Sequence, residues 1–292
     1  MPVKTPAASP LKKWLKGPLK KVYRYRHRTL KENQKYRPEG EAYLRQQAAR
    51  AMADAIRRLR QRSLFSLNPI APAGVVDPAN GYPEALSRST LMGYYGELFS
   101  GVAAEEFSPF GHQWKVPCYL FRFHEQAFFA LERYRQSGDM PQATIGRHGD
   151  DCLAFDLTDP DLARVLVFEA KCLASNQAQK IKDAHENLSN TREPLPVSIS
   201  QVIEVLQAQK EPDREWIEGL LRLAVSQPRD YERYDCVVYI CRPPKESPTW
   251  IDPDQPHVGY TGGRKLAVVE VHIDQLPEHV KSVFTGIDKH GD

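Results

Sequence analysis

One stretch of the chain constrains the fold more than any other: two strand-like runs joined by a turn. Residues 152–157 and 164–169 are rich in apolar, aromatic and β-branched residues, and residues 158–161 (Thr-Asp-Pro-Asp) have turn composition. The second run contains Val-Leu-Val-Phe at residues 165–168, apolar at consecutive positions. This pattern is typical of a central strand that is buried on both faces, as in α/β proteins.

Carboxylates and a lysine lie at the open end of this predicted hairpin. Folding back at the turn pairs residues whose numbers add up to about 320 to 322, which brings Asp151 beside Glu169 or Lys171. Side chains alternate between the faces of a strand, so Glu169 and Lys171 share one face. An even sum selects Asp151 as their partner, whereas a sum of 321 selects Asp150. We favour Asp151, which directly precedes the strand, and we expect Asp156, roughly 17 Å further along, to lie outside the site.

This combination of side chains suits metal-assisted hydrolysis. Mg²⁺ prefers oxygen ligands and commonly takes one or two protein carboxylates together with phosphate and water. Asp151 and Glu169 fit that role, and Lys171 is placed to position a nucleophile or to stabilise developing negative charge. The alternative for Glu169 and Lys171 is a strand-edge ion pair of little energetic consequence. Buried charges are costly unless they are paired or ligate a metal, so the buried strand favours the catalytic interpretation.

The motif formed by these residues resembles the PD-(D/E)XK nuclease superfamily. Residues 149–151 (Gly-Asp-Asp), where the family has Pro-Asp, are followed after 17 residues by residues 169–171 (Glu-Ala-Lys). The resemblance covers about residues 86–241. It implies a restriction-endonuclease-like core, in which helices flank a mixed central sheet.

The resemblance also implies an activity and its setting. It implies a Mg²⁺- or Mn²⁺-dependent deoxyribonuclease, with Asp151, Glu169 and Lys171 in the catalytic site. Stand-alone nucleases of this superfamily often serve in restriction, repair or bacterial antiphage defence, sometimes beside a helicase or ATPase. The chain contains no GxxxxGK[ST] signature, so an ATP-driven step requires such a partner subunit.

A glutamate on the helix before the sheet is a further element of many family members, and Glu97 matches it. Apolar residues recur here at spacings of three and four, which independently predicts a helix. These residues are Leu91, Tyr95, Leu98, Phe99 and Val102. Glu97 lies beside this apolar stripe. It is either an auxiliary metal-binding acid, as the resemblance implies, or an ordinary solvated helix glutamate.

The patterns after the motif continue the α/β order. Helical periodicity predicts three helices, and short apolar runs predict two more strands. The helices are 176–190, 198–210 and 213–226, and the strands are 234–241 and 265–273. Residues 243–263 are rich in Pro, Asp and Gly, which predicts a surface loop long enough to be a binding element.

Charge is concentrated at the amino-terminal end of the chain. Residues 1–62 contain 18 Lys or Arg against four Asp or Glu, a net charge of +14, whereas the remainder carries −11. Basic and aromatic residues alternate there, which suits contacts with phosphates and stacking on bases. The predicted nucleic-acid-binding residues are Lys12, Lys13, Lys16, Lys20, Lys21, Arg24, Arg26 and Arg28. The alternative is a flexible solvated arm.

The same segment ends in a pattern that predicts an amphipathic helix over residues 41–62. Its apolar face has few bulky side chains, so nucleic acid is favoured over an anionic membrane surface. The sequence therefore predicts two parts: a basic arm and helix over residues 1–62, and a nuclease domain over residues 63–292. Pro69, Pro72 and Gly74 mark the linker between them.

The composition predicts the cellular compartment of the protein. It leaves two functions other than a nuclease open. The sequence has no run of about 18 apolar residues, and its basic amino terminus lacks the apolar core of a signal peptide. Five cysteines form no CxxC pair, which predicts reduced thiols and a cytoplasmic protein. The alternatives to a nuclease are a catalytically inactive nucleic-acid-binding or scaffold subunit, and a metal-dependent phosphohydrolase that acts on nucleotides.

Overall fold

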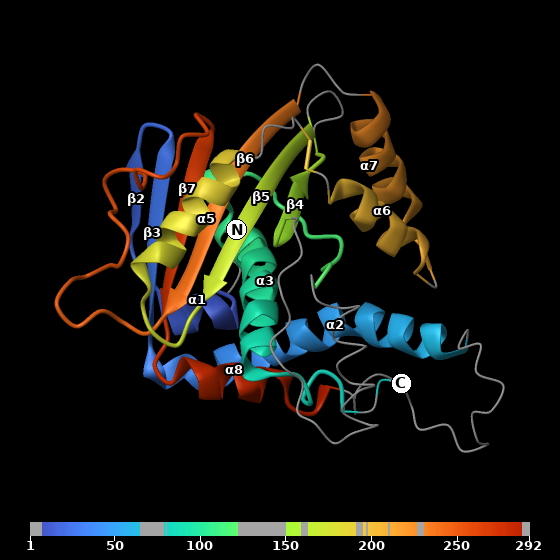
Figure 1. Cartoon of the computed structure of the whole chain (residues 1–292), viewed down its shortest axis with the longest axis horizontal. Helices are drawn as coiled ribbons and strands as arrows, with labels where there is room; N and C mark the ends of the chain where they lie inside the picture. Colours follow the sequence, from blue (N-terminus) through green and yellow to red (C-terminus); the bar gives the residue numbers. More distant parts are fainter. Residues whose placement is uncertain are drawn as a thin grey trace, which may run out of the picture.

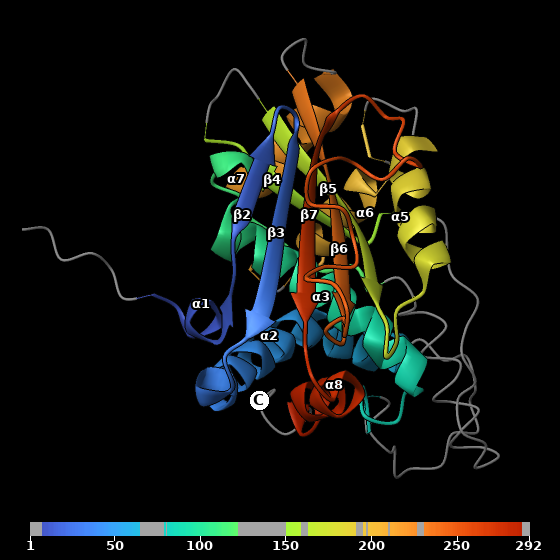
Figure 2. The same ribbon diagram turned by 90° about the vertical axis from the view of Figure 1, so that its left-hand side faces the viewer.

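The chain folds into an α/β structure in which helices flank a curled mixed sheet (Figures 1 and 2). A computed structural model describes residues 8–64, 79, 81–121, 150–158, 163–190, 195–196, 198–209, 211–226 and 231–287. None of the helices in these ranges is both long and apolar enough to cross a bilayer. The five cysteines are all buried and free.

The described strands form one seven-stranded sheet in the order β1-β3-β7-β6-β5-β4, with β2 also paired to β3. Their bounds are β1 (Leu15–Lys16), β2 (Leu19–Val22), β3 (Tyr25–Glu32), β4 (Cys152–Asp156), β5 (Ala163–Cys172), β6 (Tyr231–Cys241) and β7 (Lys265–His272). The four central strands β3, β7, β6 and β5 run parallel. Strands β1, β2 and β4 pair antiparallel with their neighbours. Strands β5, β6 and β7 have buried apolar residues on both faces, as expected for parallel strands covered by helices.

One face of the sheet, called here the α3 face, carries Leu166 and Phe168 of β5 in a core shared with four helices. These helices are α1 (Pro10–Trp14), α2 (Arg37–Leu64), α3 (Arg88–Phe107) and α8 (Leu276–Phe284). The hydroxyl of Ser87 accepts a hydrogen bond from the amide of Thr90 and begins α3. Figures 1 and 2 show α2 and α8 side by side at the end of the sheet towards which the central strands point.

The opposite face, called here the α5 face, carries Val165 and Val167 of β5 in a second core. Its helices are α5 (Ala178–Asn190), α6 (Ile199–Gln207) and α7 (Arg214–Ser226). Residues 242–264 contain no helix or strand, as predicted, but they pack on this face. The amides of Trp250 and Ile251 donate hydrogen bonds of 2.6 and 3.1 Å to the buried carboxylate of Glu270 on β7.

Most predicted elements of the motif region lie where the sequence places them. The predicted strands 152–157 and 164–169 correspond to β4 and β5, and the three predicted helices correspond to α5, α6 and α7. Residues 159–161 of the predicted turn and the predicted linker prolines lie outside the described residues. The α/β class is confirmed.

The basic segment differs from the predicted arm because part of it belongs to the sheet. Strand β3 pairs with β7 over seven residue pairs, from Tyr25–Leu266 to Lys31–His272. The alternation of basic residues with Tyr25, His27 and Thr29 is a strand pattern that buries these three side chains in the sheet. The expected boundary at residue 62 therefore does not separate the basic segment from the sheet.

Candidate active site

The register between β4 and β5 decides which aspartate faces the predicted catalytic glutamate. Cys152 pairs with Phe168, so the residue numbers of each pair add up to 320, an even sum. The amide of Asp151 donates a 3.2 Å hydrogen bond to the Phe168 carbonyl, which continues the ladder by one residue. Its carboxylate Oδ2 accepts a 2.7 Å hydrogen bond from the amide of Ala170. Asp151 thus lies beside Glu169 at the open end of the hairpin, where the sequence predicts it.

Glu169 is held by two side chains on the α5 face. The Lys171 Nζ atom lies 2.5 Å from Glu169 Oε1, and Asn187 Nδ2 donates a 3.0 Å hydrogen bond to the same oxygen. Both carboxylates are buried: Asp151 is 7% and Glu169 is 4% exposed. The structure therefore brings Asp151, Glu169 and Lys171 together at the carboxyl end of β5. Ligands of open α/β sheets typically bind at that end of the parallel strands.

Asn187 is a site residue that the sequence did not single out. It lies on α5, three residues after Ala184 and next to Leu188, both of which are buried. The sequence feature that could have identified Asn187 is its position beside the apolar stripe of the helix predicted over residues 176–190. An amide that donates to a carboxylate orients that carboxylate, so Asn187 is a positioning residue for Glu169.

Glu97 approaches from α3 and is 3% exposed, so it is a buried rather than a solvated helix glutamate. The preceding residue, Gly96, lets α3 come close to β5, because a Cβ atom there would lie 3.2 Å from the Cβ of Ala170. Burial raises the pKa of the Cys152 thiol, and the carboxylates of Glu97 and Asp151 raise it further. Glu97 and Asp151 therefore lie near the same cysteine, at the start of β4.

The fit of these residues to a metal ion rests on their chemistry. Among the residues that the structure describes, no three His, Cys, Asp or Glu side chains form a group that could hold a metal. Mg²⁺, however, needs only one or two protein carboxylates when phosphate and water complete its shell. Asp151 and Glu169, opposite one another on neighbouring strands, provide two hard oxygen donors of that kind.

The other aspartates of the hairpin have different surroundings. The amide of Asp150 donates to Ser198 Oγ at 3.2 Å, and its buried Oδ2 atom has no hydrogen-bond partner in the part of the chain that the structure describes. Asp156 pairs with Arg164 at the far end of β4, away from Glu169, as expected. Burial raises the pKa of Asp156, but hydrogen bonds from Thr158 and Gln113 outweigh this effect and lower it overall.

The predicted nucleic-acid-binding residues are distributed over α1, the first three strands and their turns. Three of them contact other parts of the fold: Lys12 lies 3.5 Å from Glu106, Lys20 pairs with Asp254, and Arg24 donates a 3.0 Å bond to the Gly263 carbonyl. Arg26 and Arg28 occupy positions of β3 whose partners in β7, Ala267 and Val269, belong to the core on the α3 face. These two arginines therefore extend from the face opposite to Lys171 and Glu169.

No protein-family model matches the chain, and no curated protein matches it. A proposal for its function therefore rests on the residues of the candidate site and their geometry.

Proposed function

We propose that this protein is a metal-dependent nuclease of the PD-(D/E)XK type, with a restriction-endonuclease-like core, that hydrolyses phosphodiester bonds in DNA. The observation that carries the proposal is the placement of Asp151 opposite Glu169 on neighbouring strands, with Lys171 in contact with Glu169. Two carboxylates and a lysine at one strand end suit metal-assisted phosphodiester hydrolysis, because the carboxylates can hold the metal and the lysine can stabilise developing negative charge.

Each of these residues has a defined role in the proposed reaction. Asp151 and Glu169 would hold Mg²⁺ or Mn²⁺, with Glu97 as an auxiliary acid. The bound ion would supply Lewis-acid polarisation of the scissile phosphate. Lys171 would stabilise the charge that develops on the phosphoryl oxygens, and it is partly enclosed, so little solvent screens its charge. Asn187 would keep the Glu169 carboxylate in one orientation.

DNA as the substrate and the biological setting come from the resemblance of the motif to the superfamily. In that setting the protein would be the effector of a bacterial antiphage-defence or restriction system, with a helicase or ATPase as a partner subunit. The basic amino-terminal segment, with a net charge of +14 over residues 1–62, supports a polymeric anion as the substrate.

A cleavage assay with matched variants tests the proposal. Duplex and single-stranded DNA and RNA are incubated with Mg²⁺ or Mn²⁺ and with wild type, Asp151→Asn, Glu169→Gln or Lys171→Met. We expect each variant to lose at least about a hundredfold in rate, because each removes a metal ligand or a charge that acts in the transition state. The control is Glu186→Gln on the exposed side of α5, which should cleave like wild type. Cleavage by Glu169→Gln at the wild-type rate would falsify the proposed site.

A second candidate function is a catalytically inactive nucleic-acid-binding or scaffold subunit. The observation that favours it is that Glu169 Oε1 is already bonded to both Lys171 and Asn187. DNA binding by wild type without cleavage under Mg²⁺ or Mn²⁺ identifies this function. In that case Glu169→Gln should leave the affinity for DNA unchanged.

A further inference from the structure

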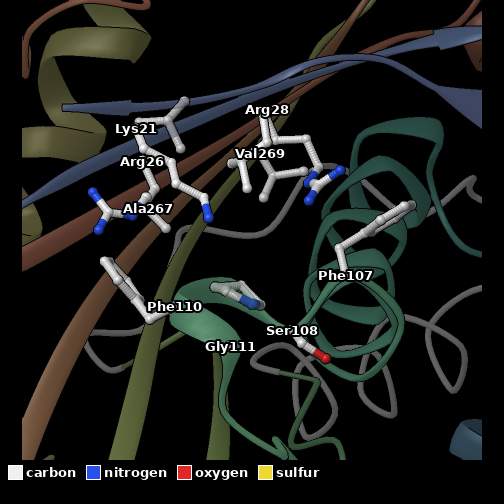
Figure 3. Close-up of a pocket in the computed structure, with 12 residues that line it drawn as sticks. Lys21, Arg26, Arg28, Phe107, Ser108, Phe110, Gly111, Ala267 and Val269 are labelled. Atoms are coloured by element: carbon white, nitrogen blue, oxygen red, sulfur yellow. The ribbon is translucent and has the colours of Figure 1, made fainter.

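A cavity of about 220 Å³ lies on the α3 face, between the β2–β3 hairpin and the carboxyl end of α3 (Figure 3). Lys21, Arg26 and Arg28 line it from the strands, and Phe107 and Phe110 line it from α3 and the turn that follows. Figure 3 shows the three basic side chains extending from the strands towards the segment that carries the two phenylalanines. The cavity is therefore bounded by cations on one side and aromatic rings on the other.

The three basic residues of this cavity have no acidic partner among the described residues. Within the described ranges, no ion pair joins Lys21, Arg26 or Arg28 to an acidic side chain. Arg26 donates hydrogen bonds to the carbonyls of Tyr23 and Tyr25, and Arg28 lies 5.3 Å from the centre of the Phe107 ring. Both arginines are half-buried. A guanidinium stays protonated in proteins, so the cavity holds partly desolvated positive charge that an anion would stabilise.

The surroundings of the cavity indicate which anion fits. Its volume is below the roughly 300–1,000 Å³ of pockets that enclose a whole drug-sized ligand, so it accommodates one small group. Guanidinium groups match the geometry of phosphate, and aromatic side chains stack with bases of single-stranded nucleic acids. A second, more open cavity of about 540 Å³ shares Arg28, Phe107 and Ser108 and adds Lys12, Lys16 and Glu106, of which Lys12 lies 3.5 Å from Glu106. The two cavities adjoin at Arg28, and the three basic residues outweigh the single carboxylate in the lining of the open one.

We infer that the smaller cavity is a subsite for one backbone phosphate of a single-stranded nucleic acid. Arg28, Arg26 and Lys21 hold this phosphate, and the adjacent base stacks on Phe107. The neighbouring phosphates of the strand follow the open cavity past Lys16 and Lys12. The inference shares with the proposed function only the class of ligand, since the subsite lies on the face opposite to Glu169.

A measurement of DNA binding in the absence of metal tests this subsite independently of catalysis. Full-length protein carrying Glu169→Gln is titrated into a fluorescent single-stranded oligodeoxynucleotide in EDTA, at several salt concentrations. We expect Arg28→Gln and Lys21→Gln each to weaken binding about tenfold or more and to reduce the slope of log K against log salt by roughly 0.7 per lost phosphate contact. The control is Arg88→Gln, an equal charge change at the exposed amino end of α3, which should change the affinity less than twofold.

Further arms of the experiment distinguish the ligand. Phe107→Leu should weaken single-strand binding and leave duplex binding unchanged, because it removes the stacking face but keeps apolar volume. Inorganic phosphate at the same phosphate concentration should compete poorly with the oligonucleotide. Displacement by inorganic phosphate at that concentration overturns the nucleic-acid assignment, as does an equal loss of affinity in Arg28→Gln and Arg88→Gln. A failure of cleavage that leaves these binding results intact overturns only the nuclease.

Discussion

At the residue scale, His185 is a buried histidine on the α5 face whose pKa is lowered by burial. Its ring is fully buried on α5, with Nδ1 2.7 Å from the Ile181 carbonyl and a buried Nε2 that has no hydrogen-bond partner among the described residues. Burial lowers the pKa of His185 from 6.5 to about 4; the Ile181 carbonyl partly opposes this and His257 adds to it. The folded protein therefore keeps this imidazole neutral where the unfolded chain binds a proton.

This difference predicts a loss of stability in mild acid. Between pH 6.5 and pH 4 the unfolded state binds more protons at this position, so the free energy of unfolding falls as the pH is lowered. The depressed pKa corresponds to a loss of about 3 kcal/mol over that range. Urea unfolding of wild type and His185→Leu at pH 7, 5.5 and 4.5 measures it. The stability of wild type should fall relative to the variant as pH decreases, and parallel curves would contradict the assignment.

At the residue scale, the sequence was sufficient for the centre of the candidate site but not for its surroundings. The alternation of strand faces places Glu169 and Lys171 on one face from counting alone, whereas the choice of Asp151 over Asp150 depended on a register sum that the pairing of Cys152 with Phe168 supplies. Asn187 and Glu97 belong to helices, and their distances to Glu169 and Cys152 depend on how α5 and α3 pack on the sheet. Helix packing angles are set by tertiary contacts, which a single sequence does not display.

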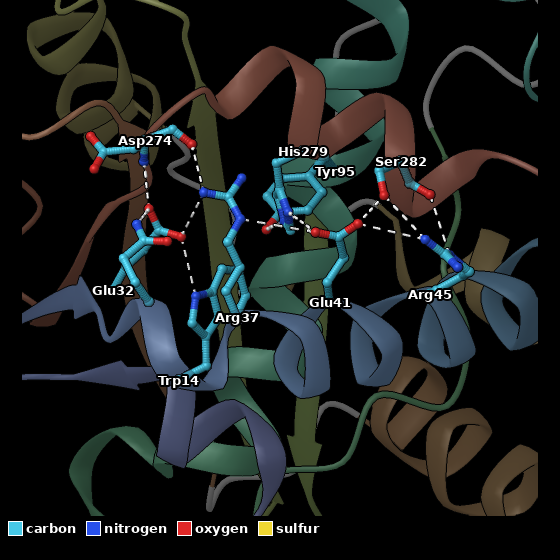
Figure 4. Close-up of polar contacts among 10 residues, drawn as sticks. Trp14, Glu32, Arg37, Glu41, Arg45, Tyr95, Asp274, His279 and Ser282 are labelled. Atoms are coloured by element: carbon cyan, nitrogen blue, oxygen red, sulfur yellow. Dashed lines mark hydrogen bonds and ion pairs between the residues drawn. The ribbon is translucent and has the colours of Figure 1, made fainter.

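At the scale of elements, a polar network joins α2, α3 and α8 (Figure 4). His279 of α8 is buried and lies between Tyr95 Oη, at 2.9 Å from Nε2, and Glu41 Oε2, at 3.3 Å from Nδ1. The hydrogen bond with His279 lowers the pKa of the Glu41 carboxyl. Arg37 and Arg45, one helical turn before and after Glu41, also approach this carboxylate. The network is therefore a contact between three helices rather than a surface ion pair.

Removal of the central side chain should loosen these helices. His279→Ala deletes a buried ring and leaves the Tyr95 hydroxyl without this partner, so we expect a loss of about 3 kcal/mol in the free energy of unfolding. The control is Glu278→Ala on the same helix, whose side chain is 68% exposed and which should change stability by less than about 0.5 kcal/mol. Equal effects of the two substitutions in thermal or urea unfolding would show that the network does not stabilise the fold.

Among the elements, β3 is a strand that the sequence did not predict. Its residues read as a basic arm because charge dominates the pattern, whereas Tyr25, His27 and Thr29 bury the alternate positions. Its pairing with β7 joins segments far apart in the chain, and neither periodicity nor composition encodes that pairing. Strands β4 to β7 were predictable because their apolar runs are continuous.

At the scale of the whole molecule, the basic segment cannot be removed without removing part of the sheet. A chain of residues 63–292 lacks β1, β2, β3 and most of α2, and it leaves the β7 edge unpaired. We expect this truncated protein to aggregate or to lose the cooperative unfolding transition of the full chain. Circular dichroism with thermal melting measures the result, and a sharp transition at the full-length temperature would show that the segment is an independent arm.

The pairing of β3 with β7 also sets the order of events during synthesis. The contact between Arg24 and Gly263 alone spans 239 residues of chain. At ribosomal rates of about 5–20 residues per second, β3 waits on the order of tens of seconds for its partner. The sheet around Asp151 and Glu169 is completed only after β7 has left the ribosome. A nascent chain would therefore complete the sheet that carries the candidate site only after residues 265–272 have been synthesised.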